Sequence, residues 1–548
     1  MVDNDLQFEK CFAPKAMMLS WERANISIGS DAKDYFGISI YQSNIKKRLD
    51  QLSERILNGK YQPLRPFKYF EPKSTGTQRT KTVLNIEDAL VYQAIGNHIA
   101  ELLYQELEET RQSVFGSVLN ANVKNGVKLL DEETEDYYFF EYYVNLYNRF
   151  IDSIEATVKI KSITHILETD ITGFFDAIPH SVLILELKKR GVSKPILDLL
   201  AICLNVWSGT RDEITPGVGI PQGPAASYLF ANILLDRLDR FVIKTGVYYY
   251  RFMDDIRIYG KSNNELLSIL VGVDRCLKGM SLSLNAQKTS IKSIDDLDKE
   301  KDQILDSSTF EIELDALDFD PETKEQIKSD PIGGDSEIKI IDNIYATKLY
   351  QLLIGKAENN IGDLVYGEDN DDLLRPTKVR EFLTLAHDWR KLARALSGNS
   401  DWKPDHSFIP VWLNSIPKFY WKSNHIVWNL RYYSLDGYYE KINELIDHFN
   451  DYEWIQYQLL QLIGELVLDD KEKQLECIRK INVTSSPLVR LGYYKVMLHT
   501  IKTDSKLFET LAISLKAEEN EFVKNSVMNA IHLNFSKISL DILNNWFR

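Results

Sequence analysis

Two segments of the chain carry carboxylates in a setting suited to catalysis. In residues 164–180, THILETDITGFFDAIPH, an apolar run typical of a β-strand leads into Asp170. In residues 248–259, YYYRFMDDIRIY, two strand-like runs flank Asp254 and Asp255, which predicts a tight hairpin turn at this pair. Adjacent carboxylates repel one another unless a cation neutralises them. Three such groups brought together would suit two Mg²⁺ ions about 3.5–4 Å apart, which activate an attacking oxygen and stabilise the leaving one in phosphoryl transfer.

These signals, and two others nearby, also have plain structural explanations. Aspartates are common in turns, so Asp254 and Asp255 taken alone predict only a turn. The stretch 217–235, GVGIPQGPAASYLFANILL, predicts a Gly/Pro loop and then a helix from about Ala225, and the loop backbone could closely approach a nucleotide or a template strand. Lys288, near the end of a predicted strand, has a solvated lysine as its simplest explanation. Neither a GxxxxGK[ST] phosphate loop nor an HExxH motif occurs in the sequence.

The elements that must position these segments are predicted from hydrophobic periodicity and from Gly and Pro. Residues 43–61 and 86–107 show helical spacing, and the proline-containing stretch 61–86 predicts an extended hairpin with a polar turn at 74–77. Residues 136–158 are rich in tyrosine and predict an amphipathic helix whose rings lie in the core. A base-stacking role for these rings is the alternative.

Length and composition exclude several classes of protein. A chain of 548 residues is too long for one core and predicts roughly two to four domains. The 44% hydrophobic and 26% charged content indicates a globular protein rather than a disordered or collagen-like one. No apolar run approaches about 18 residues and the first residues are polar, so we expect neither a membrane span nor a secretory signal. Four cysteines without a CxxC pair argue against a zinc ribbon or disulfide framework and favour a reducing cytoplasm.

The net charge of −15 argues at first against a nucleic-acid partner, but this charge is unevenly distributed. Residues 1–300 contain 36 Lys+Arg and 40 Asp+Glu, whereas residues 301–548 contain 29 and 40. The acidic stretch Asp295–Glu337 predicts a solvated connector, or an acidic surface that excludes or mimics nucleic acid. Beyond about residue 343, amphipathic segments recur at roughly 35–45 residues, which predicts a HEAT-like α-solenoid or an irregular helical domain.

Taken in order, the chemical segments resemble the motifs of a reverse transcriptase. DITGFFDAIPH resembles motif A, GIPQGPAASYLFANILL motif B, FMDD the YxDD box of motif C and LSLNAQKT motif D. The resemblance covers about residues 15–292 and implies an α+β fold: the fingers and palm of a right-hand polymerase, an antiparallel sheet with helices, followed by the all-α HEAT-like domain. The expected domains are an N-terminal and fingers region (1–110), a palm (111–294), an acidic connector (295–342) and a helical repeat-like domain (343–548).

The resemblance implies which residues bind metal. Asp170, Asp254 and Asp255 would be the catalytic carboxylates and would hold two Mg²⁺ ions, or Mn²⁺, with the carbonyl of Ile171 helping. The box departs from the usual pattern, because Phe252 stands where tyrosine is common. This change removes a hydroxyl but keeps the ring, so we expect the activity to survive.

The resemblance also implies the residues that contact the incoming nucleotide. Lys73 and Arg79 would contact its triphosphate from the fingers, although two solvated hairpin charges would look the same in the sequence. Phe175 would exclude a ribose 2′-OH, so dNTPs would be preferred. Gln222 would lie near the nucleotide, and Lys288 near its phosphates. The work of the protein would then be positioning and charge stabilisation of an in-line attack.

The layout of the chain is similar to that of the abortive-infection and related phage-defence reverse transcriptases of bacteria. No VTG triplet, maturase region or recognisable thumb is visible, and a helical domain follows the palm instead. The resemblance implies a homo-oligomeric polymerase that makes single-stranded DNA with or without an RNA template, in some members attached to a tyrosine. Candidates for that tyrosine are Tyr35, Tyr41, Tyr432, Tyr433, Tyr438 and Tyr439.

Two other functions remain open. The same chemistry could belong to a template-copying enzyme of a retroelement, which predicts a neighbouring structured RNA gene or intron. A scaffold that has lost catalysis and binds nucleic acid or a phage protein is the alternative of another class. The presence of all three carboxylates argues against the scaffold.

Overall fold

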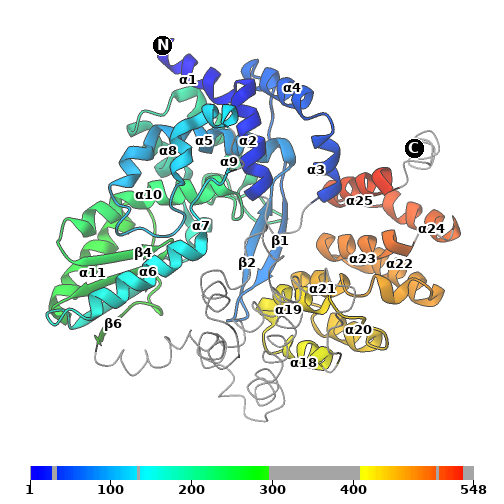
Figure 1. Cartoon of the computed structure of the whole chain (residues 1–548). Helices are drawn as coiled ribbons and strands as arrows, with labels where there is room; N and C mark the ends of the chain where they lie inside the picture. The colour runs from blue at the N-terminus through cyan, green and yellow to red at the C-terminus, as the bar shows by residue number, and fades with distance from the viewer. Residues whose placement is uncertain are drawn as a thin grey trace, which may run out of the picture. The chain divides into compact units, whose positions relative to one another are not determined.

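A computed structural model describes residues 2–27, 34–132, 136–294, 406, 408–500 and 505–534. The chain divides into two compact units, which we describe separately (Figure 1). The first comprises Met1–Tyr69 and Thr80–Asp298, and the second Phe70–Arg79 and Lys299–Arg548. The predicted acidic connector, residues 295–342, lies outside the described residues.

A four-stranded antiparallel sheet in the order β4-β5-β3-β6 is the centre of the first unit. Its strands are β3 (His165–Asp170), β4 (Tyr248–Phe252), β5 (Asp255–Gly260) and β6 (Ser290–Ser293). β-Branched and aromatic residues recur along these strands, which fits a pleated, half-buried surface. The predicted antiparallel sheet is confirmed.

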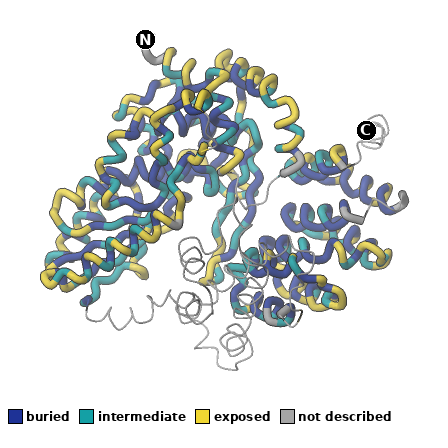
Figure 2. The backbone as a smooth tube through the Cα atoms, in the orientation of Figure 1, coloured by how far each residue is buried: buried dark blue, intermediate teal, exposed yellow. Residues whose placement is uncertain are grey.

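Helices cover both faces of this sheet, and alternation along each strand divides its side chains between two cores. Figure 2 colours the chain by burial and shows buried residues, in dark blue, throughout the interior of this unit. Leu167, Ile256 and Ile258 face the larger core with helices α10 (Ala225–Ile243) and α11 (Asn263–Lys278). The opposite face contributes Ile166 and Tyr259 to a smaller core with Phe150 and Ile154, which come from helix α6 (Tyr143–Val158). Asp170 and Asp255 share the face of Ile166 and Tyr259 by the same alternation.

The remaining helices of the first unit pack against α5 (Ile86–Glu108), which is buried on nearly every side, or against one another. They are α1 (Val2–Phe12), α2 (Pro14–Ser27), α3 (Tyr35–Gln42), α4 (Ile45–Leu57), the 3₁₀ segment η1 (Ala121–Asp131), α7 (Phe174–Ala177), α8 (His180–Lys189) and α9 (Lys194–Trp207). The helices predicted at 43–61 and 86–107 are therefore present as α4 and α5. No described helix is both long and apolar enough to cross a membrane.

The tyrosine-rich stretch differs from its prediction. The helix begins only at Tyr143, and residues 136–142 before it are not helical. Tyr138, Tyr142 and Tyr143 expose 57, 67 and 61% of their surface, so these rings are not core residues. Phe150, about two turns after Tyr143, enters the smaller core, and Phe139, ahead of the helix, enters the larger one.

The second unit contains a succession of short helices. They are α18 (Phe408–Ser415), the 3₁₀ turn η4 (Tyr420–Lys422), α19 (Ser423–Leu430), α20 (Tyr439–His448), α21 (Glu453–Leu460), η5 (Glu465–Val467), α22 (Lys471–Val483), α23 (Pro487–Thr500), α24 (Ser505–Lys516) and α25 (Glu521–Asn534). Helices α21 and α23 pack closely at Gly492, where an added Cβ would lie 2.7 Å from Leu460. The helical character is confirmed for these residues, whereas a HEAT-like repeat stays a prediction.

The predicted hairpin is present as β1 (Phe67–Pro72) and β2 (Gln78–Val83). Its tip belongs to the second unit, where three side chains hold its backbone. Glu453 accepts a hydrogen bond from the amide of Phe70 at 2.8 Å. The hydroxyl of Tyr420 donates to the carbonyls of Lys73 and Ser74, each at 3.2 Å, and that of Tyr452 lies 3.4 Å from the carbonyl of Gly76.

Candidate active site

The register of the palm sheet brings two predicted catalytic residues together. Asp170, the last residue of β3, pairs directly with Asp255, the first residue of β5. Strands β4 and β5 are joined by the two-residue turn Met253-Asp254, as the sequence predicted. Met253 has a φ of +55°, an uncommon left-handed conformation for a residue other than glycine. The three residues therefore lie at the same end of the sheet.

The carboxylates at this end influence one another electrostatically. Burial raises the pKa of Asp255; Arg257, whose Nη2 lies 3.8 Å away, opposes that rise, and the carboxylates of Glu168, Asp254 and Asp170 add to it. The folded chain thus concentrates negative charge that a bound cation would relieve.

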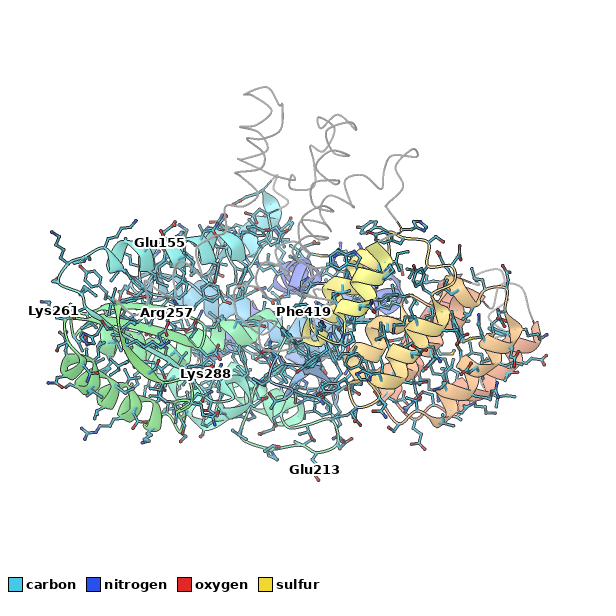
Figure 3. The ribbon with its side chains drawn as sticks, turned by 90° about the horizontal axis from the view of Figure 1, so that it is seen from below. Glu155, Glu213, Arg257, Lys261, Lys288 and Phe419 are labelled. Carbon is cyan, nitrogen blue, oxygen red and sulfur yellow. The ribbon has the colours of Figure 1, made fainter. Side chains whose placement is uncertain are left out.

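Lys288 supplies a positive charge at the same place. It belongs to the predicted motif D, which begins at Leu282. Its ammonium group forms an ion pair with the carboxylate of Asp170. The loop is held in position because the amide of Asn285 donates to the carbonyl of Asp170 at 2.8 Å. Lys288 remains 64% exposed, so solvent reaches this pair, and Figure 3 labels it together with Arg257.

Among the described residues, no three His, Cys, Asp or Glu side chains are gathered as a ready metal site. The carboxylate of Asp170 is instead paired with the ammonium group of Lys288. The donor chemistry nevertheless fits Mg²⁺, because carboxylate oxygens are its preferred protein ligands and Lys288 already occupies the place of a cation. A cation bound to Asp170 would compete with the ammonium group of Lys288 for this carboxylate.

The loop before α10 is fixed against the segment after β3. The amide of Ile220 donates to the carbonyl of Phe175 at 2.9 Å, and Gly219, with φ +87°, would bring a Cβ within 3.2 Å of the Asp176 carbonyl. Phe175 is 8% exposed and packs edge to face on Tyr228 at 5.2 Å. The carbonyl of Gln222 accepts from the amide of Thr82 on β2 at 3.1 Å. The predicted residues Phe175 and Gln222 thus lie on segments that are joined to one another.

The two predicted fingers contacts are not joined to the carboxylates by any described contact. Lys73 and Arg79 belong to the hairpin tip, in the second unit. The carbonyl of Lys73 accepts from the Gly76 amide at 3.0 Å, and Arg79 lies 3.9 Å from Glu71 in an ion pair. Their role at the triphosphate therefore stays a prediction, as does that of the Ile171 carbonyl.

The candidate priming tyrosines differ in accessibility. Tyr41 is 5% exposed and stacks on Trp21, and Tyr433 and Tyr439 are each 7% exposed. A buried hydroxyl cannot attack a nucleotide without local opening, which disfavours these three. The side chain of Tyr35 lies outside the described residues.

Sequence reasoning missed a buried network directly beneath the turn. Arg251, two residues before Met253, is fully buried and forms an ion pair with Asp239 of α10 at 2.6 Å. One signal could have found it, because a charged residue at an inward position of an otherwise apolar strand requires a buried partner.

Comparison with known proteins agrees with this geometry. Residues 52–328, just over half of the chain, match the family model described as reverse transcriptase (RNA-dependent DNA polymerase). The chain belongs to the reverse transcriptase family. Its polymerase fold is accordingly one of helices around antiparallel sheets, and divalent metal ions such as Mg²⁺ are generally used within this family.

Individual relatives of this reverse transcriptase are distant. It is 29% identical over 109 residues to the "Putative COX1/OXI3 intron 2 protein" of Saccharomyces cerevisiae, and 36% over 85 residues to an "Uncharacterized 91 kDa protein in cob intron" of Schizosaccharomyces pombe. These matches cover 19 and 15% of this chain and span only 13 and 10% of those relatives.

Solved structures of telomerases match this chain with low TM-scores. One from Candida albicans with a fragment of telomeric RNA has a TM-score of 0.32 and 12% identity, covering 82% of this chain and 69% of that one. Apo telomerase from Candida tropicalis has a TM-score of 0.29 and 9% identity, covering 91 and 74%. Values this low carry no statement about activity.

Proposed function

We propose that this protein is a DNA polymerase of the reverse transcriptase type, which adds dNTPs to a 3′-hydroxyl by two-metal nucleotidyl transfer. The observation that carries the proposal is the pairing of Asp170 with Asp255, with Asp254 in the adjoining turn. A solvated Asp-Asp turn needs no third carboxylate opposite it, whereas a two-metal site does.

In this proposal Asp170, Asp254 and Asp255, with the carbonyl of Ile171, would hold the ions. Bound Mg²⁺ would lower the pKa of the attacking hydroxyl and stabilise the charge on the leaving oxygen. The chain itself would supply orientation and charge: Lys288 is an exposed cation, and once released from Asp170 it would stabilise the charge on the phosphates.

The other predicted residues would select and hold the nucleotide. Phe175 would present its ring where a ribose 2′-OH would fall, and its packing on Tyr228 gives that ring little freedom to move aside. Gln222 would lie near the nucleotide, since its loop is pinned to the Phe175 segment. Lys73 and Arg79, on the exposed hairpin tip, would contact the triphosphate.

We propose phage defence of the bacterial abortive-infection type as the biological role, and assign 1–110, 111–294, 295–342 and 343–548 as fingers, palm, connector and helical domain. The support is the succession of helices that follows the palm in the chain. Homo-oligomerisation, synthesis without a template and attachment of DNA to a tyrosine belong to the same proposal. Tyr432 and Tyr438 are half-buried, whereas Tyr433 and Tyr439 are buried, so the first two are the better candidates for DNA attachment.

A template-copying retroelement enzyme is the second candidate function. Both matching relatives are named for introns, and an intron-encoded protein copies its own RNA in this candidate. It predicts extension of a primer annealed to RNA and a structured RNA beside the gene.

The deciding experiment is incubation of the full chain with Mg²⁺ and labelled dNTPs, with and without a primed RNA template. Label that forms without template and migrates with the protein until protease is added would support protein priming. Extension of the primer alone would favour the retroelement enzyme. Absence of incorporation under both conditions would contradict the polymerase proposal and favour the scaffold.

A further inference from the structure

Arg251 is a charged side chain with no exposure to solvent, one residue before Phe252 in β4. Taking a guanidinium group out of water is costly unless every donor is matched by an acceptor. The backbone of Arg251 is also fixed. Its amide donates to the carbonyl of Ser113 at 2.8 Å, and its carbonyl accepts from the amide of Phe115 at 2.9 Å. Both the strand and the guanidinium are therefore held from several sides.

Four hydrogen bonds engage four of the five N–H donors of the guanidinium. Nε and Nη2 donate to the two carboxylate oxygens of Asp239 at 2.7 and 2.6 Å, a bidentate pair. Nη1 donates to Oδ1 of Asn232 at 3.0 Å, and also to the carbonyl of Met253 at 2.8 Å. Asp239 and Asn232 both come from α10, so the fourth bond ties the turn that carries Asp254 to a rigid helix.

The turn is also held from its other side by the segment 113–117. Asn232 donates through Nδ2 to the carbonyls of Gly116 and Ser117 at 2.9 and 3.1 Å, which draws this segment against α10. Gly116 approaches the turn so closely that an added Cβ would lie 2.4 Å from the amide nitrogen of Met253. Met253, which has the left-handed φ, thus lies between Arg251 on one side and Gly116 on the other.

We propose that Arg251 is a positioning residue: through its bond to the Met253 carbonyl it holds Asp254 and Asp255 in the orientation needed to bind metal. The inference rests on the proposed function for the identity of the metal ligands. A purely stabilising pair would not need this geometry, because buried ion pairs are often replaced by apolar residues at no loss of stability. The bond that distinguishes the two roles is the one from Nη1 to the turn.

The test compares Arg251→Lys with Arg490→Lys in the full-length chain. Lysine keeps the charge but cannot form the planar fork. Arg490 is the matched control, because it makes the same bidentate pair with buried Glu518, at 2.8 and 2.7 Å, in the second unit. Mn²⁺ binding is measured by electron paramagnetic resonance titration, and the part of the binding that Asp254→Asn removes is assigned to the site. Thermal unfolding is measured without metal.

We expect Arg251→Lys to weaken Mn²⁺ binding by about 10-fold or more, as loss of a group that orients ligands does elsewhere. Arg490→Lys should lower the unfolding temperature without changing Mn²⁺ affinity. Wild-type Mn²⁺ affinity in folded Arg251→Lys would overturn the inference, and so would an equal loss of affinity in Arg490→Lys.

A second variant covers the case in which Arg251→Lys does not fold. Gly116→Ala leaves the Arg251–Asp239 pair intact but displaces Met253, and it should weaken Mn²⁺ binding in the same way; unchanged binding would overturn the inference. Because binding is read without turnover, the two proposals fail differently. If the chain binds Mn²⁺ through Asp254 but incorporates no nucleotide, only the polymerase proposal is contradicted. If the chain shows no Mn²⁺ binding that depends on Asp254, both the polymerase proposal and the positioning role of Arg251 are contradicted.

Discussion

Asp170 and Asp255 lie directly opposite each other on adjacent antiparallel strands. Side chains of directly paired residues on one face of a sheet have Cβ atoms about 4.5–5.5 Å apart, so two carboxylates in this relation repel unless a cation lies between them. A shift of one residue in the register would send one of them to the opposite face. The sheet register is therefore the structural basis of the proposed metal site.

The first prediction uses the alternation along β3. Asp170→Asn should reduce nucleotide incorporation by at least about 100-fold, because metal ligation supplies several kcal/mol of transition-state stabilisation. Glu168→Gln is the matched control, two residues earlier on the same face and 3.5 Å from Lys292. It should retain incorporation within a few fold. Equal losses in both variants would show that charge on this face, not ligation by Asp170, supports the activity.

Much of this site could be predicted from the sequence because its signals are local. The hairpin at Asp254-Asp255 is marked by two strand-like runs and their turn, and the helix from Ala225 by the Gly/Pro loop before it. Asp170 was located by the same local pattern, a strand that ends in a carboxylate. The sequence suggested that Asp170 could join the pair across neighbouring strands, but the register with β5 could not be derived from it, because register is a tertiary property.

The features that were missed depend on partners distant in sequence. The burial of Arg251 requires Asp239 and Asn232, and periodicity in β4 alone does not show where the fork points. The exposure of Tyr138 and Tyr143 was mispredicted because helical spacing of aromatic residues is the same for a core face and for a surface face. The HEAT-like repeat has no local signature here, since no consensus residue recurs.

The second prediction concerns the ion pair between Lys288 and Asp170. Lys288→Met removes the cation that competes with Mg²⁺ for this carboxylate, so the Mg²⁺ concentration for half-maximal incorporation should fall severalfold. The maximal rate should fall by about 10-fold or more, because a positive charge near the phosphates is lost. Lys278→Met is the control, since Lys278 forms a comparably exposed pair with Asp274 at 2.7 Å on α11. An increased Mg²⁺ requirement in Lys288→Met would contradict the competition.

The third prediction follows from the raised pKa of Asp255. A carboxyl whose pKa is raised by folding binds its proton more tightly in the folded state, so metal-free stability falls as pH rises above the ordinary value of 3.8 through the raised pKa. Asp255→Asn removes this penalty. In EDTA it should raise the unfolding temperature at pH 7, and the gain should disappear as pH approaches 3.8. Thermal unfolding between pH 4 and 8 measures both; a lower unfolding temperature at pH 7 would contradict the electrostatic argument.

The fourth prediction concerns sugar selection by Phe175. Phe175→Val removes most of the ring that would meet a ribose 2′-OH, so the preference for dNTPs over rNTPs should fall by about 10- to 100-fold. The measurement is the ratio of kcat/KM for dGTP and GTP. Tyr228→Phe keeps the ring on which Phe175 packs at 5.2 Å and should leave the ratio unchanged. A lower dGTP rate with no gain in GTP use would mean that Phe175 supports packing rather than selection.

The last prediction concerns the hairpin tip in the second unit. The hydroxyl of Tyr420 donates to the carbonyls of Lys73 and Ser74, so Tyr420→Phe removes the donor and keeps the ring. One hydrogen bond contributes about 0.5–1.5 kcal/mol, so exchange of the Lys73 and Gly76 amides should accelerate by roughly 2- to 12-fold.

The matched control is Tyr493→Phe, in the same unit but with no hydrogen bond to the tip among the described contacts. Hydrogen–deuterium exchange of peptides spanning 70–79 gives the measurement. If Lys73 contacts the triphosphate, Tyr420→Phe should also raise KM for dNTPs while kcat changes little, because looser positioning of a binding group weakens ground-state and transition-state contacts alike. Faster exchange without a change in KM would keep the structural role of Tyr420 and remove Lys73 from the nucleotide site.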